Sequence, residues 1–193
     1  RGFCRSCDLT NVNLEAIDLH GADLYSANLT GANLRRVNFR GVNLSGVHLR
    51  GTDLEGSNLI GANLSAVDLT GANLTGVDLS RANLAGANLV GVNLSKANLT
   101  GAVLIGADLN QTVLINADLT DAKIEQGKLD QALLCHTKTI DGAVSGCNLS
   151  GRDLVGVDLQ GTNLAEADFS DANLTGAVLR GTNLVGANLA DAD

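Results

Sequence analysis

A leucine recurs at every fifth position through most of this chain, and this period restricts the fold more than any other feature. From Leu59 to Leu104 the leucines follow one another without a miss. A helix turns about 100° per residue, so residues five apart spread around its surface. A straight strand sends them alternately to opposite faces. All the leucines share one side only if the chain bends once per repeat, and stacked coils of this kind form a β-solenoid.

The repeat resembles that of the pentapeptide-repeat family, whose consensus is close to A(D/N)LXX. The central site occurs 26 times from Leu9 to Leu134 and nine times from Leu149 to Leu189; 32 of these 35 sites are leucine, and Asn or Asp precedes 28 of them. The resemblance implies an all-β fold, a right-handed quadrilateral β-helix with four pentapeptides, or twenty residues, per coil. We expect residues 1–193 to form a single solenoid domain, interrupted by an irregular segment at 135–148.

The residue types at the other repeat positions agree with this fold. From Asn58 to Leu104 a small or β-branched residue stands two places before each leucine, which leaves room in the interior for one leucine from each wall. Asn and Asp suit bends because their side chains bond nearby backbone groups. Glycine recurs two places after the leucine, where a corner requires unusual dihedral angles. Twenty-residue coils predict that Leu59, Leu79 and Leu99 stack on one interior ladder.

The repeat is broken between Leu134 and Leu149, which are fifteen residues apart, so the frame is kept. The sequence LCHTKTIDGAVSGCNL leaves two interpretations open: a degenerate continuation of the coil, or an excursion from the wall, which we favour. The segment resembles the L-C-x-T…D-G…C element of some cyanobacterial-type pentapeptide proteins. Beyond it, Arg152 occupies an inward small site, where an unpaired guanidinium cannot be buried. We therefore expect the wall to open at Arg152.

A cluster of apolar residues stands at outward sites just before this break. Twenty-residue stacking places Val113 beside Leu133 on one wall, with Ile115 flanking them and Cys135 further along the same wall. Clustered exposed apolar residues mark contacts, unlike scattered ones. One interpretation is that residues 136–146 fold back and cover this patch. The other is that the loop and the patch together bind a partner.

The four cysteines form two sequence pairs. For Cys4 and Cys7 the C-x-x-C spacing is compatible with a disulfide, a redox centre, half a metal site or two buried thiols. A zinc site made from all four is excluded, because Cys7 and Cys135 would lie about six coils, or roughly 30 Å, apart. We predict Cys4–Cys7 and Cys135–Cys147 disulfides. In an unbroken coil Cys135 would point outward and Cys147 inward, so the second disulfide requires the excursion.

Composition and charge bear on function. The formal net charge is −8, which argues against a nucleic-acid partner. The basic residues Arg35, Arg36, Arg40 and Arg50 lack aromatic neighbours and make a weak anion-site signal. A leucine-filled rod offers no pocket with convergent polar groups, so we expect no enzyme activity, no cofactor and no metal site. The sequence favours a rigid scaffold for an unknown protein partner. The alternative is an acidic DNA mimic that binds a DNA-handling enzyme such as gyrase.

Location and assembly follow from weaker signals. No run of about 18 apolar residues is present, so we expect no membrane insertion. Two disulfides would place the protein in an oxidising compartment, the periplasm or the thylakoid lumen, with the cytoplasm as the alternative. No capping helix follows Leu189, and solenoid ends usually need polar caps. We therefore expect this coil end to be covered by a partner, by another copy in end-to-end self-association, or by further residues of the protein.

Overall fold

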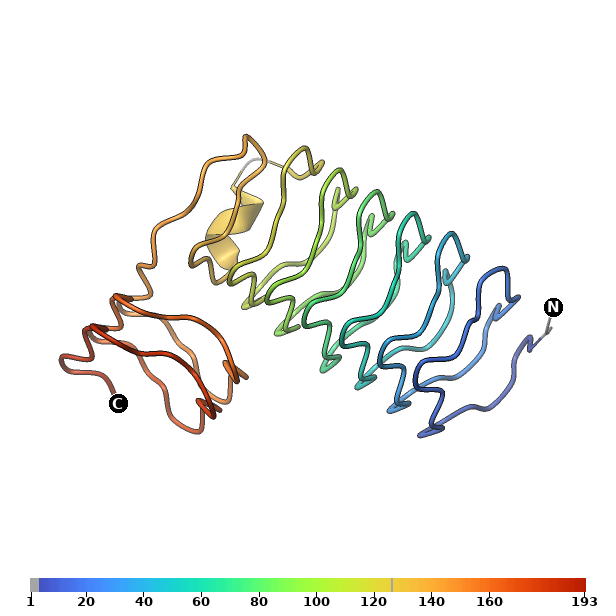
Figure 1. Ribbon diagram of the computed structural model, residues 1–193, viewed down its shortest axis with the longest axis horizontal. Helices are drawn as coiled ribbons and strands as arrows, with labels where there is room; N and C mark the ends of the chain where they lie inside the picture. Colours follow the sequence, from blue (N-terminus) through green and yellow to red (C-terminus); the bar gives the residue numbers. More distant parts are fainter. Residues whose placement is uncertain (1–3, 126) are drawn as a thin grey trace.

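The computed structural model describes residues 4–125 and 127–193, and in this part the chain forms two stacks of coils (Figure 1). The first stack comprises residues 4–138 and the second comprises residues 148–193. The second stack lies beside the C-terminal end of the first, and its coils do not continue the axis of the first stack. Within the described residues the one named element is a short 3₁₀ helix, η1, at Lys128–Gln131.

Extended segments in successive coils pair through isolated parallel β-bridges between residues twenty apart. Asn58 pairs with Asp78, and Asp78 pairs with Asn98. The backbone amide of Leu59 donates to the carbonyl of Asp78 at 2.7 Å, which joins one coil to the next. The prediction that Leu59, Leu79 and Leu99 share one ladder is confirmed, because each directly follows a residue of this bridge series.

Each corner is a tight turn fixed by the residues around the central leucine. At a typical corner the amide of Ala62 donates to the carbonyl of Leu59, and Gly61 between them has φ of 64°. Positive φ at the third residue is the mark of a type II turn and favours glycine. The Asx side chain completes the corner: the Oδ1 of Asn58 accepts a hydrogen bond from the amide of Ile60 at 3.1 Å. Both expectations for the corners are therefore confirmed.

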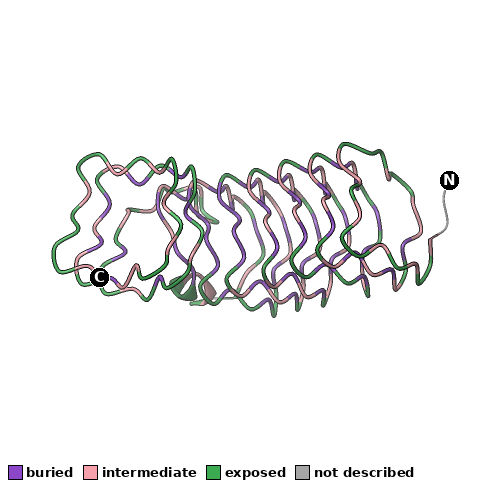
Figure 2. Cartoon of the chain, turned by 90° about the horizontal axis from the view of Figure 1, so that it is seen from below, coloured by how far each residue is buried: buried purple, intermediate pink, exposed green. Residues whose placement is uncertain are grey.

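The interior of each stack is a column of leucines and small residues. The central leucines from Leu29 to Leu119 are almost fully buried, and Phe39 fills one such site without residual exposure. Figure 2 shows the buried residues along the inner side of the coils. Burial of each leucine contributes roughly 1.5–3 kcal/mol, so the stability of the stack grows with the number of coils.

The chain leaves the first stack later than the sequence suggested. Thr137 and Lys138 still belong to the coil, because the Oγ1 of Thr137 donates to the carbonyl of Leu114 and Lys138 forms a bridge with Asp118. A hairpin follows, in which Lys138 pairs in antiparallel fashion with Val144. Parallel pairing resumes at Asn148, which bridges to Asp168 in the second stack. The irregular segment is thus part coil and part excursion.

Candidate interaction surface

Val113, Ile115 and Leu133 lie on one wall of the first stack, together with Cys135. Val113 and Leu133 form a parallel bridge, so they are direct neighbours, as the twenty-residue period requires. The four residues retain at most 2% of their accessible surface. We call this wall, with Asn93 and Ser95 in the preceding coil, the docking wall.

The second stack covers the docking wall with its open end. The apolar cluster around Val113 and Ile115 contains the interior leucines of the first coil of the second stack, which are Leu149, Leu154, Leu159 and Leu164. All four have 0 or 1% exposure although no coil of their own stack precedes them. The cover is therefore neither the segment 136–146 nor a separate partner, and in this conformation the patch is unavailable to other proteins. Both interpretations of the patch are corrected by this packing.

Hydrogen bonds at the edge of this contact hold the two stacks together. The Nδ2 of Asn93 donates to the carbonyl of Asp158 at 3.2 Å, and the Nζ of Lys96 donates to the carbonyl of Gly161 at 3.0 Å. Inside a stack the Asx carbonyl accepts a bond from the preceding coil, as Asp78 does from Leu59. Asp158 has no preceding coil, so Asn93 supplies the missing donor.

Arg152 lies at the rim of the second stack. Its Nη1 and Nη2 atoms both donate to the carbonyl oxygen of Asp130, at 3.2 Å each, and Asp130 belongs to helix η1 of the first stack. The inward site of Arg152 thus opens onto the junction between the stacks. The guanidinium is therefore hydrogen-bonded to Asp130, and the wall is open at Arg152, as expected from its charge.

Three of the four arginines that the sequence grouped, Arg35, Arg36 and Arg50, are paired with acidic residues of neighbouring coils. Arg35 contacts Asp53 and Glu55, and Arg50 contacts Asp68 at 2.8 Å. The hydrogen bonds that Arg35 donates to Glu55, and then to Asp53, stabilise its charged form and raise the pKa of Arg35. Arg36 pairs with Glu15. These pairs are exposed or half-buried and contribute little stability, but they neutralise part of the acidic surface and weaken the cationic patch that the sequence indicated.

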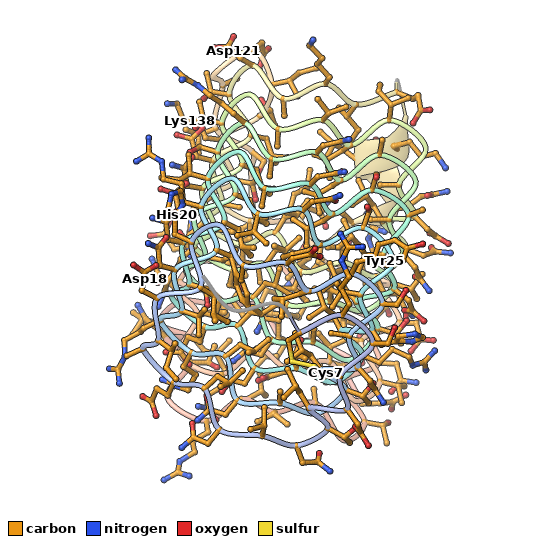
Figure 3. The ribbon with its side chains drawn as sticks, turned by 90° about the vertical axis from the view of Figure 1, so that its right-hand side faces the viewer. Cys7, Asp18, His20, Tyr25, Asp121 and Lys138 are labelled. Atoms are coloured by element: carbon orange, nitrogen blue, oxygen red, sulfur yellow. A yellow bond between two sulfur atoms is a disulfide. The ribbon has the colours of Figure 1, made fainter. Side chains whose placement is uncertain are left out.

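The wall opposite the docking wall is exposed and carries the one tyrosine of the chain. Tyr25 is 57% exposed and lines a shallow depression of about 370 Å³ together with Arg5, Asp23 and Asn43. Figure 3 shows Tyr25 on the other side of the coil from His20. Ile105 lies on the same wall and is 45% exposed. We call this wall the tyrosine wall.

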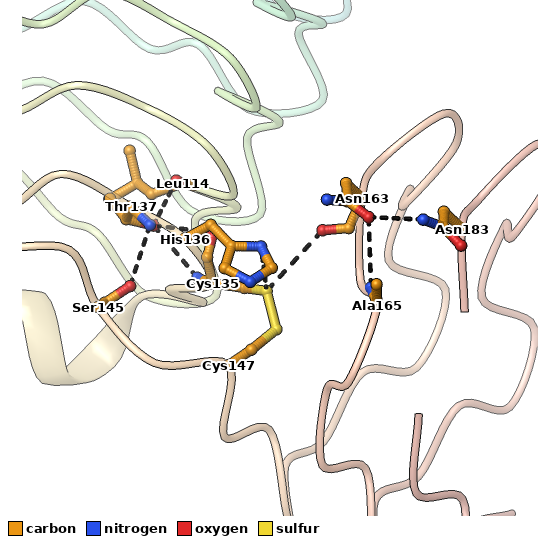
Figure 4. The surroundings of a disulfide bond; sticks show 9 residues. All are labelled: Leu114, Cys135, His136, Thr137, Ser145, Cys147, Asn163, Ala165 and Asn183. Atoms are coloured by element: carbon orange, nitrogen blue, oxygen red, sulfur yellow. Dashed lines mark hydrogen bonds between the residues drawn. A yellow bond between two sulfur atoms is a disulfide. The ribbon is translucent and has the colours of Figure 1, made fainter. Parts of the chain in front are cut away.

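The structure joins Cys4 to Cys7 and Cys135 to Cys147. Cys7 lies near the N-terminal end of the first stack (Figure 3), whereas the second disulfide lies at the junction of the stacks (Figure 4). The hairpin after Lys138 turns the chain back, so that Cys147 reaches Cys135. The same turn places His136 beside the sulfur atoms, a proximity that the sequence analysis did not foresee.

The last coil of the second stack has an incompletely covered interior. Leu174, Leu179 and Leu184 are half-buried and Leu189 is 45% exposed. End-to-end self-association through such a coil stays a prediction. Within residues 4–125 and 127–193, no helix has the length and apolarity needed to cross a membrane.

Comparisons with known proteins agree with the repeat geometry. The family model for pentapeptide repeats matches in eight copies, which together span residues 4–134 and 145–193. No curated protein matches the chain. Among solved structures, HetL of the cyanobacterium Nostoc sp. strain PCC 7120, described as involved in heterocyst differentiation regulation, is 31% identical over 98% of this chain and 88% of its own, with a TM-score of 0.32.

Two further solved structures are similar to the chain. A pentapeptide repeat protein from the Arabidopsis thaliana thylakoid lumen is 32% identical over 57% of this chain and 74% of its own, with a TM-score of 0.38. QnrB1, a plasmid-mediated fluoroquinolone resistance protein, is 18% identical over 93% of this chain and 83% of its own, with a TM-score of 0.37. With its repeats matched along both stacks, the chain belongs to the pentapeptide repeat family.

Proposed function

We propose that this protein is a non-enzymatic scaffold that presents rigid, flat walls to a protein partner. One observation carries the proposal: outward side chains stack in register twenty residues apart and bond to one another. The Nδ2 of Asn63 donates to the Oδ1 of Asn43 at 3.0 Å, and the Nδ2 of Asn83 donates to the Oδ1 of Asn63 at 3.2 Å. The proposal takes the coil to be right-handed, as the family resemblance implies, and quadrilateral, which the twenty-residue spacing of the bridges supports.

Such a wall suits recognition because it loses little conformational freedom on binding. Its backbone is bonded to the coils on both sides, and its Asx side chains are already fixed at the corners. Preorganised surfaces avoid the entropic cost of ordering side chains and loops at an interface. Members of the pentapeptide repeat family are generally non-enzymatic, and the leucine-filled interior agrees with a role in binding rather than in catalysis.

The tyrosine wall is the best candidate for the contact. The docking wall is covered near its C-terminal end by the second stack, whereas the wall opposite is open. Tyrosine is among the residues that contribute most binding energy at protein interfaces. Tyr25 has a depression beside it and a charged pair, Arg5 with Asp23, at its edge.

The acidic DNA mimic is the weaker alternative. Mimicry of DNA needs an unbroken row of negative charge, because a duplex carries one charge per about 1.7 Å. In the first stack Arg35 and Arg50 interrupt such rows and neutralise carboxylates in the adjacent coil. We expect the purified protein to leave the supercoiling activity of gyrase unchanged.

An affinity capture from the native source tests the scaffold proposal. The bait is the wild-type chain, and the test variant is Tyr25→Ala, with Thr30→Ala on a neighbouring wall as the matched control. A partner that is captured by the wild type and by Thr30→Ala, but not by Tyr25→Ala, supports the tyrosine wall. Equal capture by all three folded baits would move the contact to another wall, and inhibition of gyrase would favour the mimic.

We also propose an oxidising compartment, the periplasm or the thylakoid lumen. The two disulfides support it, since such bonds persist in oxidising environments and are rare in the cytosol. The intact mass of unreduced protein from the native source is the test. A mass that shows four free thiols would contradict the proposal.

A further inference from the structure

Three metal-binding side chains meet at the junction of the two stacks. The sulfur atoms of Cys135 and Cys147 and a ring nitrogen of His136 all lie within 4.8 Å of one another (Figure 4). The Sγ of Cys135 is 3.6 Å from the Nδ1 of His136. No second group of this kind is found among the described residues. In this structure the two sulfurs are bonded to each other.

The positions of these side chains are fixed by contacts that do not depend on the disulfide. Cys135 is held in the coil because the amide of Asn116 donates to its carbonyl at 2.9 Å. His136 occupies a corner with φ of 51°, the left-handed conformation that recurs at the corners of the coils. Two bonds between Thr137 and Ser145, at 2.8 and 3.0 Å, tie down the returning segment that carries Cys147. The three groups therefore stay close when the sulfur–sulfur bond is broken.

We propose that Cys135, His136 and Cys147 form a binding site for Zn²⁺ or a similar thiophilic divalent ion when the disulfide is reduced. Two thiolates and an imidazole are the ligands that zinc favours. Zn–S bonds of about 2.3 Å and Zn–N bonds of about 2.0–2.1 Å put sulfur and nitrogen ligands about 3.6 Å apart in a tetrahedron. The separation of Cys135 Sγ and His136 Nδ1 matches this value.

The reaction that opens the site is a simple thiol exchange. A dithiol reductant transfers two electrons and two protons to the disulfide, which becomes two thiols, while the reductant becomes a disulfide. Each thiol then loses its proton as the metal binds, so two protons are released per ion. The fourth position is left to water or to the carbonyl of Asn163, which lies 3.9 Å from the Sγ of Cys135.

The site is consequently controlled by redox state. In the oxidised protein the sulfurs have no thiolate to offer, so the site stays closed, and reduction makes it available. The Cys4–Cys7 disulfide differs, because no third metal ligand joins it in the described residues. This second pair provides a matched control within the same chain. The inference stands independently of the scaffold proposal.

The experiment measures metal binding to the full chain by titration with Zn²⁺ against a chelator, and with Co²⁺ followed by absorption. Cys4 and Cys7 are replaced by serine, and a phosphine reductant is used because it supplies no thiol ligand. We expect one ion per reduced chain, a cobalt–thiolate absorption band and no binding to the oxidised chain. His136→Ala should weaken binding by about tenfold or more, and Cys147→Ser should abolish the band.

A chain that keeps Cys4 and Cys7 but carries Cys135→Ser and Cys147→Ser is the control. Equal affinity of this control and of the test chain would overturn the proposal, as would binding to the oxidised form. Unchanged affinity in His136→Ala would remove the histidine from the site. Circular dichroism of each reduced chain shows whether the stacks stay folded. If reduction unfolds the parent chain and the reduced chain binds no metal, the preformed site is refuted.

Discussion

The two stacks are built from the same repeat but differ in what lies against their N-terminal faces. In the first stack, Leu9, Leu14 and Leu19 are half-buried at that face. In the second stack, Leu149 and Leu154 at the corresponding face are almost fully buried, because they pack on the docking wall. The comparison shows that an open coil end is an apolar surface, and that a change of a few outward residues makes a wall able to bind it.

The largest effect should come from a charge placed inside a complete coil. Leu79→Asp buries a carboxylate with no partner among leucines of the first stack, which should cost about 3–5 kcal/mol. Leu184→Asp in the half-buried last coil is the matched substitution and should cost much less. Thermal unfolding followed by circular dichroism checks both. Similar melting of the two variants would contradict the assignment of Leu79 to the interior.

A charge in the docking wall should separate the stacks without unfolding the first. Ile115 has no exposed surface and contacts the second stack, so Ile115→Asp should lose about 3 kcal/mol of packing. We expect rapid proteolysis at residues 139–147 and an altered scattering profile in solution. Ile105→Asp on the tyrosine wall is the control and should behave as the wild type. Equal protease resistance of both variants would count against end-on docking.

The two disulfides should differ in their contribution to stability. The Cys135–Cys147 disulfide joins residues with a sequence separation of 12. The Cys4–Cys7 disulfide joins residues with a sequence separation of 3. Loop-closure entropy gives about 3 kcal/mol for the former and about 2 kcal/mol for the latter. Denaturant unfolding of the two double-serine variants measures the difference. A greater loss from removal of the N-terminal pair would show that the junction does not depend on its disulfide.

A smaller effect is expected at the rim of the junction. Arg152→Ala removes the two hydrogen bonds to the carbonyl of Asp130 and should cost about 1 kcal/mol. Arg180→Ala in the same stack serves as the control. The midpoint of denaturant unfolding is the measurement. If both variants keep the wild-type midpoint, the guanidinium does not hold the stacks together.

The smallest effect should be the pH dependence of the corner aspartates. Hydrogen bonds from the hydroxyl and amide of Thr70, and the charge of Arg50, lower the pKa of Asp68. A lowered pKa adds stability above the unfolded value of about 3.9, and this stability is lost as pH falls through the folded value. Asp68→Asn keeps the Oδ1 acceptor but does not titrate. The melting temperature of this variant should therefore fall less between pH 7 and pH 3 than that of the wild type.

Most of the fold could be predicted because the repeat fixes every residue of a coil. The period of five with Asx before leucine predicts the corners, and a coil of twenty residues places Val113 beside Leu133. The change of direction after Lys138 could not be predicted in the same way. The open end of the second stack includes Leu149 and Leu154. Their sequence pattern is the same as that of the leucines in an interior coil, so it does not indicate an end. Within the second stack, Arg152 at an inward small site is the residue whose type did not fit a continued coil.

The metal-ligand cluster could be predicted only in part: the pairing of Cys135 with Cys147 was predicted, but the approach of the His136 ring to the sulfur atoms was not. Cys135 and Cys147 belong to different repeat positions, and only the hairpin between them brings the second sulfur to His136. Their encounter depends on backbone bonds such as that from Ser145 to Thr137, which no repeat rule specifies.

The twenty-residue spacing of the bridges also restricts how a gene for such a protein can lengthen. A duplication of four repeats before Val113 adds one whole coil and leaves every later residue on its original wall. A duplication of a single repeat between Lys96 and Val113 would turn all later residues by one side of the coil. Asn93 and Lys96 would then face a different direction from Leu133, and the surface that receives the second stack would be divided between two walls. Insertions and deletions tolerated within the first stack should therefore come in multiples of twenty residues.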